Sequence, residues 1–369
     1  MRFFAAIQSG NHPPLSGTNG LEKARERVEI LAKSVATAWG RIQQLTSKMG
    51  DSYQAVFVAP EFYFVNNQAA SAPDRYLSHD DKRWTVAQLA AIAKSFPKLL
   101  IIPGTVLWTK AVNESNTGKT KERIVKAYEQ HKSALPKLQE KHGAQYGNNV
   151  ESIVSNQSGQ KHFAYSGSAK IPAQTYPPYY LLDSVPDTVI AQNVAYVCKG
   201  DTILKYAKVG NSHELGGNQS NAVFSPGSLA GLFSVGDVRY GLEICMDHWV
   251  GVLQHGTGAL SAPHIQIITS SYTENRSFHF KVADNGLILH SSTEGSIEPY
   301  ETTGIPDAPP TEEALTNGLK LFSFQLGIAA DGKATDALTS QGDNQGIGIE
   351  GALPKVKKTH SDLAENWFG

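Results

Sequence analysis

Apolar and polar residues along the chain repeat with two periods, one typical of helices and one typical of strands. Leu21 to Leu45 carries apolar residues at alternating three- and four-residue steps, which predicts a long amphipathic helix. Val86 to Phe96 predicts a second helix, closed by Pro97. Buried strands are predicted at three short apolar runs: Phe3 to Gln8, Ala55 to Ala59 and Leu99 to Ile102. Because strands and helices alternate, the sequence predicts an α/β fold.

The later part of the chain continues as strands joined by tight turns. Gly200-Asp201 and Gly236-Asp237 each separate two alternating runs, which predicts two hairpins. The paired runs are Ala191 to Cys198 with Thr202 to Tyr206, and Leu232 to Val235 with Val238 to Ile244. Further strands are expected at Ile265 to Thr269 and Gly286 to His290, with a helix between them.

Two regions break this pattern and set the predicted domain organisation. Residues 110–186 are interpreted as an insertion in a main domain of residues 1–295. Its first part, Lys110 to Lys141, carries eight Lys or Arg against four Glu, a local charge of +4. The insertion is expected either to lie at the mouth of a site or to be a solvated excursion without function. Residues 296–369 are predicted to be a C-terminal extension in which Leu319 to Leu326 is ordered.

Composition narrows the class of protein. The chain has 369 residues, 40% of them hydrophobic and 18% charged, which predicts a folded core. The net charge of −1 gives no reason to expect a nucleic acid or a membrane surface as partner. Two cysteines exclude a disulfide framework and favour a reducing compartment. The N-terminus is interpreted as a buried strand and not as a signal peptide, and no apolar run reaches the roughly 20 residues of a membrane span, so a cytoplasmic protein is expected.

The stretch VRYGLEICMDHW, from Val238 to Trp249, carries the first candidate for chemistry. A predicted strand ends at Ile244, and Asp247 is placed to favour the N-terminus of a helix. Cys245 therefore lies on a strand-to-helix turn, where backbone N–H groups and a helix dipole favour a thiolate. Taken by itself, the stretch favours a buried structural cysteine over a reactive one.

Glu61, Lys208 and Cys245 each stand at the end of an apolar strand, where α/β folds place reactive side chains. A carboxylate in an apolar pocket can take a thiol proton, an ammonium can stabilise an oxyanion, and a cysteine can act as nucleophile. A Cys245–His248 dyad is the alternative, although His248 is expected to face packing or solvent. The HExxH spacing of a zinc site and a glycine-rich phosphate loop are both missing from the sequence, so no metal or cofactor is expected.

Together these motifs resemble the nitrilase superfamily of carbon–nitrogen hydrolases. The resemblance is carried by APEFYF around Glu61, GDTILKYAKV around Lys208, and FSPG followed by the Cys245 stretch. IIPGTVLW, IITSSY and NGLILHSSTEG agree in order and spacing, so the match covers roughly residues 1–110 and 190–295. It implies a four-layer α-β-β-α sandwich that pairs with a second copy into a homodimer or larger oligomer. It also implies Glu61 as general base, Lys208 as oxyanion stabiliser and Cys245 as nucleophile.

The sequence departs from the family pattern at three points. Met246 stands where an aromatic residue is frequent. Members that hydrolyse nitriles commonly carry Cys-Trp-Glu, whereas the Cys-Met-Asp of this chain is more similar to the amidase branches. Ala207 stands where Arg often precedes the lysine, which makes Lys205 a minor rival to Lys208. Glu214 is the candidate for the second glutamate that many members carry.

The resemblance implies a cysteine hydrolase that cleaves a non-peptide C–N bond in a small amide or carbamoyl compound. Acyl transfer by the same cysteine, or a catalytically silent member that acts as a binding protein, are the alternatives; nitrile hydrolysis is less expected. The residues expected to line the substrate pocket are Phe62, Tyr63, Met246, His248, Ser271 and Tyr272.

Overall fold

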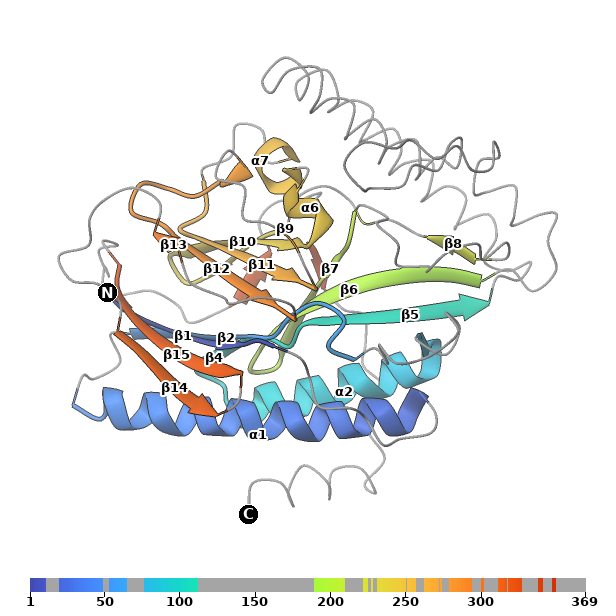
Figure 1. Cartoon of the computed structure of the whole chain (residues 1–369), viewed down its shortest axis with the longest axis horizontal. Helices are drawn as coiled ribbons and strands as arrows, with labels where there is room; N and C mark the ends of the chain where they lie inside the picture. The colour runs from blue at the N-terminus through green and yellow to red at the C-terminus, as the bar shows by residue number, and fades with distance from the viewer. Residues whose placement is uncertain are drawn as a thin grey trace.

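The chain folds into two stacked β-sheets with helices on their outer faces (Figure 1). This computed structural model describes residues 1–10, 20–48, 53–64, 76–111, 189–209, 222–224, 227, 231–249, 251–256, 262–271, 273, 279–293, 300–301, 311–316, 318–326, 338–340 and 347–349. The predicted α/β fold class is confirmed. Nearly all of the insertion predicted at residues 110–186 lies outside the described residues, so its role stays a prediction.

The first sheet has parallel strands at its centre. The strand β1 pairs in parallel with β2, and β2 pairs in parallel with β4. The strands β6 and β7 form the first predicted hairpin, which turns at Gly200. The described strands of this sheet are β1 (Arg2–Gln8), β2 (Tyr53–Val58), β3 (Leu77–Ser78), β4 (Leu99–Ile102), β5 (Thr105–Ala111), β6 (Val189–Lys199), β7 (Thr202–Ala207), β8 (Ala222–Phe224), β14 (Thr311–Thr316), β15 (Leu319–Gln325) and β17 (Ile347–Ile349).

The second sheet also has a parallel centre, in the order β10, β11, β12. The strands β9 and β10 form the second predicted hairpin, with Gly236 at φ 55° in its turn. Residues 280–286 of the connection between β11 and β12 are not helical, and residues 272 and 274–278 lie outside the described residues, so the helix expected there stays a prediction. The described strands are β9 (Gly231–Val235), β10 (Val238–Ile244), β11 (Ile265–Ser270), β12 (Leu287–Ser292), β13 (Tyr300–Glu301) and β16 (Leu338–Ser340).

Two long helices, α1 (Gly20–Thr46) and α2 (His79–Ser95), cover the outer face of the first sheet (Figure 1). Their apolar faces are buried, as the sequence period predicts. The helix α2 begins at Ser78, whose hydroxyl accepts a hydrogen bond from the backbone N–H of Asp81. Among the described residues, no helix is long and apolar enough to cross a membrane.

The main core lies between the two sheets. Alternate residues of β10 (Tyr240, Leu242 and Ile244) point into it and pack against β1, β2 and β7. On the opposite face of β10 lie two short helices, α6 (Met246–Trp249) and α7 (Val252–Gly256). The described residues contain only these two short helices on this face, so a full fourth layer stays a prediction.

Part of the predicted C-terminal extension belongs to the first sheet. The strand β15 lies between β14 and β1, and it pairs antiparallel with β1 over the whole length of β1. The side chains of Leu319, Leu321, Phe322 and Phe324 are buried there. The sequence indicates order at Leu319 to Leu326, but it does not indicate the neighbouring β14, because β14 is an exposed edge strand with little apolar character.

Candidate active site

Glu61 lies on the turn that follows β2. Its backbone N–H donates to the carbonyl of Ser270 at the end of β11, at 3.2 Å. The next residue, Phe62, has a positive φ of 57°, and its N–H donates to the Thr105 hydroxyl at 2.9 Å. Gly104 lies beneath this turn, where a Cβ atom would come within 2.2 Å of the Pro60 carbonyl oxygen. The turn therefore needs glycine at position 104, and it directs the Glu61 side chain towards the space between the sheets.

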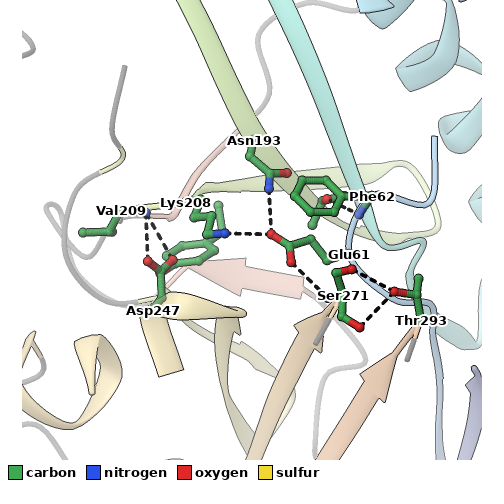
Figure 2. A network of polar contacts seen from close by, with 10 residues as sticks. Glu61, Phe62, Asn193, Lys208, Val209, Asp247, Ser271 and Thr293 are labelled. Carbon is green, nitrogen blue, oxygen red and sulfur yellow. Dashed lines mark hydrogen bonds and ion pairs between the residues drawn. The ribbon is translucent and has the colours of Figure 1, made fainter. Parts of the chain in front are cut away.

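Lys208 follows β7 directly and points at Glu61 (Figure 2). Its backbone N–H donates to the Asn193 carbonyl at 2.8 Å, which fixes the end of β7 against β6. Its Nζ lies 2.8 Å from Glu61 Oε1, and the two side chains are 1% and 0% exposed. Lys205 instead lies within β7, half-buried, opposite Gly348 of β17. The lysine that meets the carboxylate is thus Lys208.

Both oxygens of the Glu61 carboxylate accept hydrogen bonds (Figure 2). Oε1 accepts from Lys208 Nζ and, at 2.9 Å, from Asn193 Nδ2. Oε2 accepts from the backbone N–H of Ser271 at 3.0 Å. A charge buried this deeply is tolerated when an opposite charge and further donors compensate its lost hydration. The sequence motifs do not include Asn193. The signal that could have indicated it is a polar residue on the inner face of a buried strand.

Cys245 lies on a tight turn between β10 and α6. Its φ of 48° is in the left-handed region, which is unfavourable for a residue with a Cβ atom. Its N–H donates to the Thr269 carbonyl at 2.8 Å, and its side chain is 8% exposed. Strained residues of this kind cluster at functional sites. The helix that follows is one turn long, so the helix dipole expected from the sequence is small.

The strand pairing brings the ends of β2, β7 and β10 to one edge of the two sheets. Ile244 pairs with Thr269, so Cys245 lies beside the end of β11. That same end binds Glu61 through Ser270 and Ser271. Glu61 and Cys245 therefore both bind the end of β11 through their backbones, and Lys208 is held next to Glu61 by its ion pair.

Cys198 has a different environment. It lies within β6, fully buried, in the core between the first sheet and its helices. Asn193, which binds Glu61, is five positions earlier on the same strand and therefore faces the opposite side of that sheet. Burial raises the pKa of the Cys198 thiol well above its ordinary value. Both observations favour Cys245 as the reactive cysteine.

The predicted pocket residues divide between the site and other parts of the fold. The Phe62 ring lies beneath the Lys208 ammonium, with Nζ 5.9 Å from the ring centroid. The Ser271 backbone holds Glu61, and Met246 is partly buried beside the core between the sheets. Tyr63 packs instead into the helix-side core, where the Arg27 guanidinium lies 5.6 Å from its ring centroid. Glu214 and Tyr272 lie outside the described residues.

His248 lies on the outer face of the second sheet. It is fully buried, and its Nδ1 is 2.9 Å from Glu243 Oε2. Its ring stacks on Phe280 at a centroid distance of 5.6 Å. These contacts agree with a packing role, which the sequence favoured over a Cys245–His248 dyad. Within the described part of the chain, no cluster of three or more His, Cys, Asp or Glu side chains is arranged to hold a metal ion.

Glu243 is a buried carboxylate beneath α6 and α7 that contacts several polar groups. Besides His248, its carboxylate accepts from the Leu253 N–H at 2.7 Å and from Gln266 Nε2 at 2.7 Å.

We expect Glu243→Ala to lower the free energy of unfolding by about 3–5 kcal/mol, because it leaves several buried polar groups without their acceptor. Urea denaturation measures this. Glu312→Ala is the control, since it breaks a half-exposed pair with Lys320 and should cost at most about 1 kcal/mol. Equal losses would contradict the account of Glu243.

His290 gives a pH-dependent prediction. Burial lowers its pKa to about 3, with a smaller contribution from nearby His248, and its Nε2 lies 2.6 Å from the Ser270 hydroxyl. The unfolded chain takes up a proton on this residue below about pH 6.5, whereas the folded chain does not. The stability that neutral His290 contributes is therefore present above about pH 6.5 and is lost as the pH falls towards 3.

Comparing wild type with His290→Asn by urea denaturation tests this. When the pH is lowered from 7.5 to 5, the unfolding free energy of the wild type should fall by about 2 kcal/mol more than that of His290→Asn. This follows because each pKa unit corresponds to about 1.4 kcal/mol. A difference that stays constant over this pH range would contradict the burial of a neutral imidazole.

Comparison with known proteins gives matches among solved structures. No protein-family model and no curated protein matches the chain. The chain is similar to an amidase from Nesterenkonia sp., with a TM-score of 0.42 and 11% identity over 100% of this chain and 96% of that one. A mutant of the Nesterenkonia AN1 amidase, from the nitrilase superfamily, gives a TM-score of 0.41 at 11% identity over 88% of this chain and 90% of the other. A mutant in complex with butyramide gives 0.43 at 11% identity over the same shares.

These structures come from the family that the sequence motifs resemble. Because the TM-scores and identities are low, the function proposed below rests on the geometry of this site.

Proposed function

We propose that this protein is a cysteine hydrolase that cleaves a non-peptide C–N bond, in an amide or a carbamoyl group, through a thioester intermediate. The observation that supports it most is the buried Glu61–Lys208 pair, held 2.8 Å apart at the same sheet edge as the strained Cys245 turn. Burying two charges costs several kcal/mol unless they are paired and hydrogen-bonded, and both conditions hold for Glu61 and Lys208. A base, a cation and a thiol at one place have a coherent use in acyl chemistry.

In the proposed reaction, Glu61 takes the thiol proton and Cys245 attacks the carbonyl carbon. The ammonium of Lys208 and the backbone N–H of Met246 stabilise the oxyanion. Glu61 then gives the proton to the departing nitrogen, so ammonia or an amine leaves and a thioester remains on Cys245. A water molecule, deprotonated by Glu61, attacks the thioester and releases the acid and the thiol.

Each contact of Glu61 supports this cycle. Asn193 and the Ser271 N–H hold the carboxylate in place while Lys208 compensates its charge. The carboxylate can therefore pass a proton between sulfur, nitrogen and water without a change of position. Phe62, which lies against the lysine, keeps one side of the pair dry.

Ammonia release from a panel of small primary amides, carbamoyl compounds and matched nitriles tests the proposal. We expect release from amides or carbamoyl compounds and little from nitriles. Cys198→Ala should keep most of this activity, because its thiol lies in the helix-side core. Ammonia release from nitriles without any from amides would overturn the proposed substrate class.

Acyl transfer by the same thioester is the alternative chemistry. Assays with and without hydroxylamine, which serves as an amine acceptor, separate the two reactions. A hydrolase forms the free acid without any added acceptor. Product that appears only when an amine acceptor is present would favour a transferase.

A further inference from the structure

Asp247 joins the turn that carries Cys245 to the strand end that carries Lys208. It is fully buried, two residues after Cys245. Its Oδ2 accepts from the Tyr206 hydroxyl at 2.8 Å, and both carboxylate oxygens accept from the Val209 N–H at 3.1 and 3.2 Å. The two donors stand on either side of Lys208 in the sequence. Figure 2 shows the Asp247 carboxylate facing the backbone N–H of Val209.

These contacts bridge the two β-sheets. Lys208 follows β7 of the first sheet, whereas Cys245 follows β10 of the second. The relative position of lysine and cysteine depends on how the two sheets are held together at this edge. Apolar packing between the sheets is non-directional, so it fixes their spacing less sharply than hydrogen bonds to a buried carboxylate.

Tyr206 is suited to serve as a donor in this bridge. Burial raises the pKa of its hydroxyl well above the ordinary value, and the negative charge of Asp247 raises it further. Both effects favour the protonated hydroxyl, which is the form that donates to Asp247.

We infer that Asp247 is a positioning residue, which sets the distance between the Lys208 ammonium and the Cys245 thiol through Tyr206 and Val209. The inference rests on the proposed function, in which these two groups act together. Asp247 itself does not touch the reacting atoms. Its effect should therefore appear in the reactivity of Cys245 and in kcat, and much less in KM.

The test compares Asp247→Ala, Asp247→Asn and Tyr206→Phe for the rate of Cys245 alkylation by iodoacetamide and for kcat and KM. Alkylation is read by mass spectrometry of the Cys245 peptide, so it does not depend on amide turnover. Asp247→Ala should lower both rates by about 10²-fold, because a misplacement of about 1 Å at a reactive site costs that much. Asp247→Asn should stay within about tenfold of wild type, because its amide oxygen can still accept both bonds.

Tyr206→Phe removes one of the two donors and should lie between these limits. Asp201→Asn, at an exposed carboxylate paired with Lys94, is the control and should match wild type. Circular dichroism verifies folding. If Asp247→Ala does not fold, the double variant Asp247→Asn/Tyr206→Phe replaces it and should lose at least about tenfold in both rates.

Wild-type rates in a folded Asp247→Ala, or in the double variant, would overturn the inference. A loss in Asp247→Asn as large as in Asp247→Ala would also overturn it, since the role would then depend on charge and not on position. If Cys245 of the wild type neither alkylates nor supports turnover, the proposed function fails and the inference with it. That outcome is distinct, because it is seen before any variant is compared.

Discussion

Replacing Cys245 with alanine is expected to abolish turnover, a loss of about 10⁶-fold in kcat, while the protein stays folded. Without the thiol no thioester can form, and Glu61 and Lys208 have no nucleophile to assist. Ammonia release measures the activity, and circular dichroism with urea denaturation measures folding. Cys245 lies on the turn after β10 and is 8% exposed, so removing its sulfur atom should cost less packing energy than the same change at the fully buried Cys198.

Cys198→Ala is the matched control for this variant. Its thiol is fully buried on the helix side of the first sheet, so its loss should affect stability more than activity. If Cys198→Ala inactivates a folded protein while Cys245→Ala remains active, the assignment of the nucleophile is wrong.

Replacing Lys208 with methionine should have the second largest effect. The variant removes the proposed oxyanion partner, which is expected to cost about 10²–10³-fold in kcat. It also leaves the Glu61 carboxylate buried without its cation, so the free energy of unfolding should fall by about 3–5 kcal/mol. Kinetics and urea denaturation measure the two losses separately.

Two further variants separate catalysis from stability at this pair. The double variant Glu61→Gln/Lys208→Met removes both charges, so it should recover much of the stability but none of the activity. Lys205→Met, three residues earlier on a half-buried position of β7, should be mild in both measurements. If Lys205→Met proves the more damaging for kcat, the roles of the two lysines are reversed.

The elements of the fold follow from local sequence, but their assembly does not. The period of α1 and the apolar runs of β1, β2 and β4 are present within each segment, so those elements could be predicted. The pairing of β15 with β1 joins residues more than 300 positions apart. Nothing in the composition of the C-terminal region indicates that partner, so the sequence alone predicts an extension there.

The site shows the same division between local and non-local information. Glu61, Lys208 and Cys245 could be located because each follows a recognisable strand. Asn193 and Asp247 could not, because their importance lies in contacts 132 and 38–41 residues away in the sequence. The positive φ at Phe62 changes the direction of the chain, so Tyr63 lies in the helix-side core although it is two residues from Glu61.

The most direct test of the central claim is the acyl adduct on the cysteine. The protein is quenched with acid during turnover of the best amide substrate from the panel, digested, and analysed by mass spectrometry. The account predicts the mass of the substrate's acyl group on the Cys245 peptide, removable by hydroxylamine, and an unmodified Cys198 peptide. Steady ammonia release with no adduct on Cys245, or with the acyl group on Cys198, would contradict it.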